Sequence, residues 1–182
     1  MANIFNRYRE LARKAEINLG TKESLDWFRK RIRKDSTIND LRTVSENLRN
    51  GRIEPGKMFT YVYDPKTKDK MQYYDNFPLV IILEVVKGGW YGANLHYLPP
   101  SMRVNLLEEL SYRRNNVLRI KRMLETNPMT KPCLKRYLSN HVRSAPKVVP
   151  KDDWEIAIQL PFENFQKAQA RQVWSNTRSK LR

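Results

Sequence analysis

The sequence predicts an α+β fold in which basic helices from both ends of the chain pack on a small antiparallel sheet. Charge is segregated along the chain: the formal net charge of +16 divides into +6 over residues 1–57, zero over 58–100 and +10 over 101–182. The neutral centre is rich in aromatic and β-branched residues, as strands are, whereas the flanks carry apolar residues at helical spacing. We therefore expect one domain of 182 residues, with a basic helical arm (1–57), a neutral β core (58–100) and a basic helical region (101–182).

Two helices are expected in the N-terminal arm. Apolar residues at helical spacing over 5–15 predict the first, and Gly20 is a plausible stop. Thr21 or Ser24 can cap the second, which ends in the basic run at 29–34. A short amphipathic segment and a loop follow, over 35–57.

The centre predicts a sheet of about three strands. The segment "MFTYVY" (58–63) has strand composition, and "DPKTKDK" (64–70) has turn composition. Residues 79–86 form a near-continuous apolar strand, and "KGG" (87–89) is a hairpin signal. The returning strand "WYGANLHYL" completes a central hairpin over 79–98.

Helices are expected again after the sheet. Pro99 and Pro100 end the last strand, and Ser101 can cap a helix that carries Leu106, Leu107 and Leu110. Further helices are expected at roughly 116–124 and 131–142, and another begins at Asp152 or Asp153, where a carboxylate suits the positive end of a helix. The last segment, 162–182, closes the domain.

The residues that usually carry chemistry are sparse. The histidines, His96 and His141, stand apart from any cluster of cysteines, so the sequence predicts neither a metal site nor a cofactor. Cys133 has no cysteine partner for an intramolecular disulfide, and we expect it to be packed in a helix rather than paired with His141 as a nucleophile. His96 is expected to make a structural hydrogen bond. No apolar run is long enough to span a membrane, and no phosphate-binding loop or other feature of a small-molecule site is present.

A metal-dependent nuclease is the enzymatic alternative. Asp75 precedes the predicted apolar strand, Glu84 lies within it, and Lys87 follows it. One nuclease pattern requires an acid and a lysine separated by a single residue on a strand, whereas two residues separate Glu84 from Lys87. That spacing places the two side chains on opposite faces of a strand, where one metal centre cannot easily use both. We therefore expect a protein that is not an enzyme.

The excess of positive charge indicates a polyanionic partner. The basic residues gather in stretches rich in arginine, whose planar fork suits phosphate oxygens, so helices that carry them can follow a DNA backbone without reading bases. Some of these residues can equally be solvated faces paired with acids such as Glu108, Glu109 and Glu125. The candidate DNA-binding residues are Arg29, Lys30, Arg31, Arg33, Lys34, Arg113, Arg114, Arg119, Lys121, Arg122, Lys135, Arg136, Arg178, Lys180 and Arg182.

One block of the sequence resembles a known family. The stretch "YDPKTKDKMQYYDNFPLVIILEVVKGGWYGANLHYLPPSMRVNLLEEL" (63–110) is similar to small virion-associated proteins of large contractile-tailed, T-even-like bacteriophages. The basic opening "IFNRYRELARKA" and the closing "RQVWSNTRSK" extend this resemblance over most of the chain. The family is known by the name DNA end protector, which implies a protein that sits on packaged DNA ends at the gate between head and tail. It supplies no catalytic residue to transfer to this chain.

Two non-enzymatic functions remain open from the sequence. In the first, basic helices bind termini of double-stranded DNA and protect them from exonucleases. In the second, the protein is a structural tail, baseplate or neck component whose basic surface binds acidic virion proteins, including the portal. Both place the protein in the virion, with the host cytoplasm as its location before assembly, and neither requires a membrane.

Overall fold

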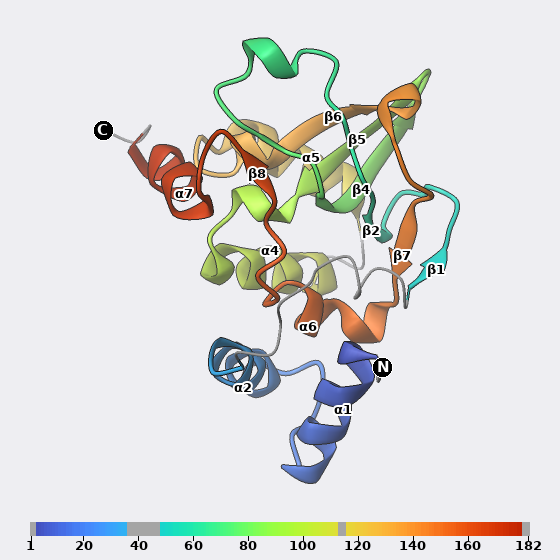
Figure 1. Ribbon diagram of the computed structural model, residues 1–182. Coiled ribbons are helices and arrows are strands. Elements are labelled where there is room, and N and C mark those ends of the chain that lie inside the picture. The colour runs from blue at the N-terminus through green and yellow to red at the C-terminus, as the bar shows by residue number, and fades with distance from the viewer. Residues whose placement is uncertain (1–2, 36–47, 113–115, 180–182) are drawn as a thin grey trace.

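A six-stranded antiparallel sheet lies at the centre of the fold, where the sequence predicted about three strands. The computed structural model describes residues 3–35, 48–112 and 116–179, and the expected α+β class is confirmed (Figure 1). The strands run in the spatial order β1-β7-β2-β4-β5-β6, and β3 pairs with β8 in a separate two-stranded sheet. The strands are β1 (Arg49–Asn50), β2 (Met58–Thr60), β3 (Tyr74–Asp75), β4 (Leu79–Val86), β5 (Gly89–Asn94), β6 (Leu134–Leu138), β7 (Lys147–Val149) and β8 (Phe165–Gln166).

The α-helices come from both flanks of the chain, as the sequence predicted. Within the described residues there are six: α1 (Ile4–Lys14), α2 (Lys22–Arg33), α4 (Pro100–Tyr112), α5 (Val117–Thr126), α6 (Trp154–Ala157) and α7 (Ala170–Ser179). Short 3-10 helices connect them and the strands: η1 (Lys68–Lys70), η2 (Leu95–Tyr97), η3 (Lys131–Cys133), η4 (Ser139–His141) and η5 (Lys151–Asp153).

The strand β6 replaces the helix that we expected at 131–142. It pairs with β5 along its whole length, from Gly89 opposite Leu138 to Ala93 opposite Leu134. Without β6, the outer backbone groups of β5 would have no partner, and a buried unpaired backbone group is costly. Tertiary pairing thus overrides the helical spacing of this segment.

Two apolar clusters cover the two faces of the sheet. The larger one joins the helices to one face and contains Phe5, Phe28, Leu83, Ile120 and Trp154, all buried. The smaller one is on the other face, where five aromatic side chains pack with two aliphatic ones: Phe59, Tyr61, Tyr63, Trp90 and Tyr137 with Val80 and Ile82. The stretch 73–100, which is poor in charge, therefore supplies much of the scaffold on both faces.

The central hairpin is confirmed, with its turn at Gly88. Gly88 has φ +79°, which favours glycine. Gly89 is required for a different reason, because a Cβ there would stand 1.9 Å from the backbone oxygen of Tyr137. The register of β4 and β5 shifts between Ile82 and Glu84. Because of this irregularity, two consecutive residues both contact α5. Leu83 packs in the core beneath that helix, and Glu84 forms an ion pair with Lys121 on it.

The second helix has the N-cap that the sequence predicted, whereas the first ends at Lys14, before the stop expected at Gly20. The Thr21 and Ser24 side chains form a reciprocal capping box at the start of α2. Leu25, Phe28 and Ile32 form the buried side of α2. The amphipathic segment that we expected after α2 falls mainly on 36–47, outside the described residues.

Cys133 is buried, as expected, but it ends the 3-10 turn η3 rather than lying in a helix. Burial raises the pKa of its thiol to about 12, so the reactive thiolate is nearly absent at neutral pH. We predict that the folded protein reacts with a thiol reagent such as DTNB at least about a hundredfold more slowly than the protein unfolded in guanidinium chloride. Equal rates in the two states would show that Cys133 is accessible.

Candidate nucleic-acid interface

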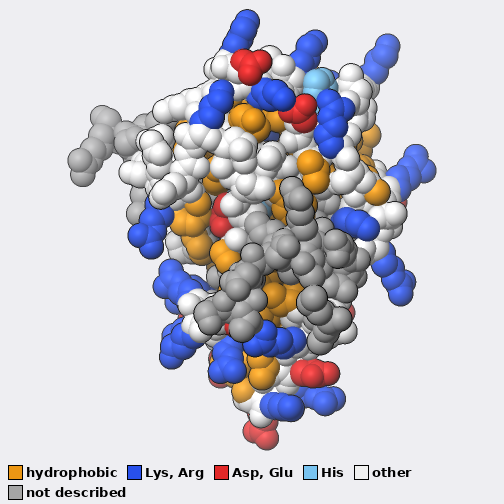
Figure 2. Space-filling view, in the orientation of Figure 1, with side chains coloured by type: hydrophobic (Ala, Val, Ile, Leu, Met, Phe, Trp, Pro, Cys, Tyr) orange, Lys and Arg blue, Asp and Glu red, His pale blue; other side chains and the backbone are white. Residues whose placement is uncertain are grey.

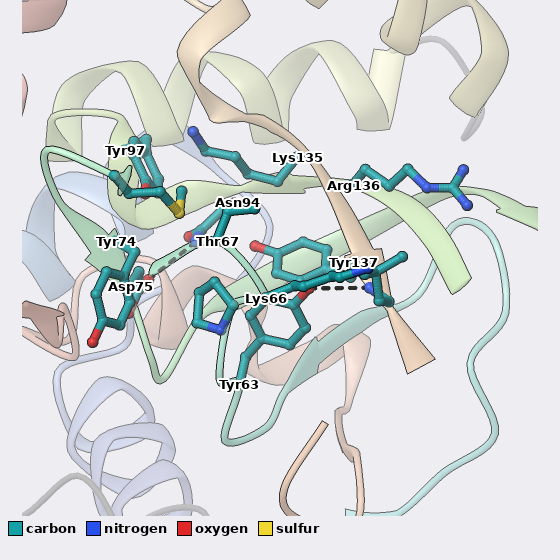
Figure 3. Close-up of a pocket in the computed structure, with 13 residues that line it drawn as sticks. Tyr63, Lys66, Thr67, Tyr74, Asp75, Asn94, Tyr97, Lys135, Arg136 and Tyr137 are labelled. Atoms are coloured by element: carbon teal, nitrogen blue, oxygen red, sulfur yellow. Dashed lines mark hydrogen bonds between the residues drawn. The ribbon is translucent and has the colours of Figure 1, made fainter. Parts of the chain in front are cut away.

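A pocket of about 270 Å³ opens beside β6, and four tyrosines are among the residues that line it (Figure 3). Segments far apart in the sequence meet there: the loop after β2, the strand β3, the end of β5, the turn η2 and the strand β6. The lining residues are Tyr63, Pro65, Lys66, Thr67, Met71, Tyr74, Asp75, Asn94, Tyr97, Lys135, Arg136, Tyr137 and Leu138.

Backbone hydrogen bonds hold the loop after β2 against the end of β6. Tyr63 forms an isolated antiparallel bridge with Val142, and its hydroxyl accepts a hydrogen bond from the backbone N–H of Leu138 at 3.1 Å. Asp64 donates its backbone N–H to His141 at 3.0 Å, and Nδ1 of His141 lies 2.8 Å from the backbone oxygen of Asp64. These contacts fix the outer wall of the pocket.

The aromatic side chains in and below the pocket are packed edge to face. The rings of Tyr63 and Tyr137 are 4.9 Å apart at 80°, and Tyr61 contacts both from below. Burial raises the pKa of Tyr63, Tyr97 and Tyr137 above the ordinary value for a phenol. The phenols are therefore neutral at physiological pH, so they do not repel an anionic ligand.

A buried carboxylate lies at the floor of the pocket. Oδ2 of Asp75 is 2.7 Å from Nδ1 of His96 and accepts a hydrogen bond from Nδ2 of Asn94 at 3.1 Å. Its Oδ1 accepts the backbone N–H of Phe77 at 3.0 Å. The structural hydrogen bond predicted for His96 is thus confirmed, although His96 lies in η2 rather than on a strand. With each carboxylate oxygen hydrogen-bonded, Asp75 stabilises the junction of β3, β5 and η2.

The two acids of the nuclease hypothesis serve separate pairs. Asp75 is buried with His96, whereas Glu84 forms an ion pair with Lys121 on α5, with 2.7 Å between Oε2 and Nζ. In the described ranges, no group of three or more histidine, cysteine, aspartate or glutamate residues is placed to hold a metal ion. Asp75 and Glu84 therefore do not form the common metal site that the nuclease hypothesis requires.

Cations surround the mouth of the pocket. Nζ of Lys135 lies 3.9 Å from the ring centroid of Tyr97, and Figure 3 shows Lys135 extending toward that ring while Arg136 extends away from the tyrosines. Arg136 instead contacts Tyr91 and donates to the backbone oxygen of Lys87 at 3.1 Å. We call the cations of this region the pocket-end surface: Lys66, Lys68, Lys70, Lys87, Lys135, Arg136, Arg143 and Lys167.

Contacts connect these cations into one region. Nζ of Lys167 donates to the backbone oxygen of Lys68 at 2.7 Å, which ties the segment after β8 to η1. Lys68 and Arg143 share Asp64, at 2.8 and 3.6 Å. In Figure 2, Lys and Arg side chains project from the upper end of the molecule, where η1 and the tip of the β4–β5 hairpin lie in Figure 1. The pocket therefore opens within a basic end of the protein.

A family comparison covers nearly the whole chain. The model of the family described as "Phage T4 terminal DNA protecting protein" matches residues 1–177. The chain belongs to this family. Searches of curated proteins and of solved structures gave no match. No helix in the described part of the chain is long and apolar enough to cross a membrane.

In this member of the terminal DNA protecting family, the candidate DNA-binding residues that the structure describes lie in three places. Lys135 and Arg136 are on β6 at the pocket, while Arg119, Lys121 and Arg122 are on α5, which packs against β4. Lys121 and Arg136 both contact the ring of Tyr91, at 4.6 and 5.4 Å from its centroid. The α2 group is at the opposite end of the molecule (Figure 1): Arg29, Lys30, Arg31, Arg33 and Lys34.

Several candidate residues cannot be placed. Arg113, Arg114, Lys180 and Arg182 lie outside the described residues, and the side chain of Arg178 is not described. Of the α2 group, Arg29 forms an ion pair with Asp26 at 2.9 Å, which fits the interpretation of a solvated, paired face for that residue.

Sequence reasoning did not identify the pocket. Its tyrosines are spread over residues 63–137, so no local motif marks them. The lysines of "KTKDK" (66–70) were interpreted only as part of a turn, although three cations in five residues were a visible signal. That turn becomes part of a basic surface only because β6 and the loop after β2 bring Lys135 and Arg136 to it.

Proposed function

We propose that this member of the terminal DNA protecting family is a virion protein that binds the ends of double-stranded DNA and shields them from exonucleases without catalysing a reaction. The observation that supports this most directly is the pocket-end surface, in which cations surround a concave aromatic pocket at one end of the molecule. Phosphate contacts by lysine and arginine supply affinity that does not depend on the base sequence. A protein that binds DNA ends of differing sequence requires such affinity.

The geometry favours contact with an end over contact along a duplex. These cations are grouped at one end of the molecule, and the pocket that they surround is a concavity rather than a long groove. A terminus seated there exposes the phosphates of its last nucleotides to Lys66, Lys70 and Lys87. The bulk of the protein then blocks an exonuclease from approaching along the helix axis.

A structural role in the virion is the second candidate, and the position of α2 favours it. The exposed cations Lys30, Arg31 and Arg33 are on α2 and Lys34 caps its C-terminal end, far from the pocket-end surface (Figure 1). This second basic surface fits an acidic neighbouring virion protein of the portal, neck, tail or baseplate. The two functions are compatible, because they use separate surfaces.

Exonuclease protection tests the first function. A linear duplex is incubated with the purified protein and then digested, with relaxed circular DNA as competitor, at about 50 to 200 mM salt. We expect the protein to prevent digestion, the circles to compete poorly, and protection to weaken steeply with salt, since each phosphate contact contributes a slope of about −0.9 to log K against log salt. Digestion at an unchanged rate, or equal competition by circles, would contradict end binding and leave the structural role.

A further inference from the structure

The tyrosine pocket has the features of a site for a single nucleotide base. Tyr63, Tyr74, Tyr97 and Tyr137 contribute to its walls, and they come from the loop after β2, β3, η2 and β6. Aromatic side chains bind nucleic acid bases by stacking, at about 1–3 kcal/mol per base, whatever the base is. A volume of about 270 Å³ is at the small end of ligand pockets, which limits the occupant to about one base.

The polar groups at the floor of the pocket are already hydrogen-bonded. Asp75 holds Asn94 and His96, and Asn94 also hydrogen-bonds the hydroxyl of Tyr137. The hydroxyl of Tyr97 hydrogen-bonds the backbone of Asp75. Such a floor is rigid and offers few free groups to read the edge of a base, so it suits an occupant held by stacking and shape rather than by sequence.

The positive charge at the mouth of the pocket favours a nucleotide, which carries a phosphate, over an uncharged aromatic ligand. Lys66 and Thr67 are exposed at the rim, and the ammonium of Lys135 lies over the ring of Tyr97. A base between the tyrosines would place its own phosphate beside these cations. A base enters such a pocket only if it leaves the stack, which costs a few kcal/mol in a duplex and less where the base is already unpaired. The terminal base has a single stacking neighbour, so it leaves most easily.

We propose, on the basis of the DNA-end binding proposed above, that the pocket takes the base of the terminal nucleotide of one strand, extruded from the duplex, with its phosphate at Lys66 and Lys135. The pocket thereby distinguishes an end from the interior of DNA. Circular DNA offers phosphates to the same cations but no terminal base.

The first test uses the unaltered protein and three duplexes: one with an unpaired nucleotide at each end, one with an abasic nucleotide at that position, and a dumbbell whose ends are closed by loops. We expect the first to bind about tenfold more tightly than the abasic duplex, within the range of one stacked base. Equal affinity for the base-bearing and abasic ends would overturn the pocket proposal.

A second test fills the pocket from its rim. Thr67 precedes η1, and its side chain makes no capping hydrogen bond there, so a larger residue at this position costs no local bond. Thr67→Trp should abolish the preference for the base-bearing end and leave affinity for the dumbbell unchanged. Gln72→Trp is the matched control, because Gln72 is exposed on the same loop and does not line the pocket; it should keep the preference.

The outcomes separate the two proposals. If the unaltered protein binds none of the duplexes, the proposed function itself fails, and the pocket inference fails with it. If it protects ends but Thr67→Trp keeps the full preference for the base-bearing end, the pocket inference alone is wrong. A loss of affinity that is equal for open and closed ends would also contradict a role for the pocket in recognising termini.

Discussion

Replacing Lys66, Lys70 and Lys87 with glutamate is expected to weaken binding to a short linear duplex about a hundredfold at physiological salt, because three phosphate contacts become repulsive. All three lysines are exposed, and none forms an ion pair with any residue that the structure describes. The slope of log K against log salt should become shallower by about 2.7, at about 0.9 for each lost contact. Fluorescence anisotropy of a labelled duplex over a salt series measures both quantities.

A second triple variant provides the control for net charge. Lys30→Glu, Arg33→Glu and Lys34→Glu on α2 lower the formal charge by the same six units, from +16 to +10, at the opposite end of the molecule. We expect this variant to bind the duplex within about threefold of the unaltered protein, since charges beyond about 10 Å are largely screened at such salt. It should instead lose attachment to an acidic virion partner, if α2 has the structural role.

The comparison of the two triple variants decides where DNA binds. Equal losses from both would show that net charge alone governs binding, with no specific surface. A larger loss from the α2 variant would show that the basic helix predicted from the sequence is the DNA site and that the pocket-end surface is not.

Arg103→Ala is expected to lower the free energy of unfolding by about 3–5 kcal/mol, because it leaves a carboxylate without its buried partner. The guanidinium of Arg103 forms an ion pair with Glu163 and donates to the backbone oxygens of Leu98 at 2.8 Å and Ile158 at 3.2 Å. It also lies 5.5 Å from the ring centroid of Trp174. With a side chain only 1% exposed, Arg103 joins the end of η2 to α6, α7 and the segment before β8.

Chemical denaturation with guanidinium chloride measures this loss, and thermal unfolding should shift by roughly 10 °C for a chain of this length. Arg119→Ala is the matched control, since Arg119 is exposed on α5 and should stay within about 0.5 kcal/mol of the unaltered protein. The double variant Arg103→Met with Glu163→Gln should recover part of the loss, because no buried charge then lacks a partner. If Arg103→Ala unfolds like the control, the buried pair contributes little.

Local signals in the sequence predicted the helices α1, α2, α4 and α5, the start of α6 and the β4–β5 hairpin, whereas α7 was not predicted. The capping box at Thr21 and Ser24 and the glycine turn at Gly88 are signals that each segment carries within itself. The strand β6 and the short strands β1 and β7 carry no such signal. Each is five residues or fewer and forms because a neighbouring strand offers unpaired backbone groups.

The sequence by itself determined the α+β fold class and the neutral segment between basic flanks. It also carried the resemblance to phage DNA end protectors, which the family match over residues 1–177 confirmed. These properties follow from composition and local pattern, which a linear reading can detect.

Only the tertiary structure decided which cations share a surface and which arginine is buried. Arg103 and Arg119 look alike in the sequence, yet one is paired in the core and the other is exposed. Lys66 and Lys135 are 69 positions apart and line one pocket, while the dense run on α2 lies at the other end of the molecule. Such groupings depend on long-range strand pairing, and pairing between distant segments leaves no mark in the local sequence of either one.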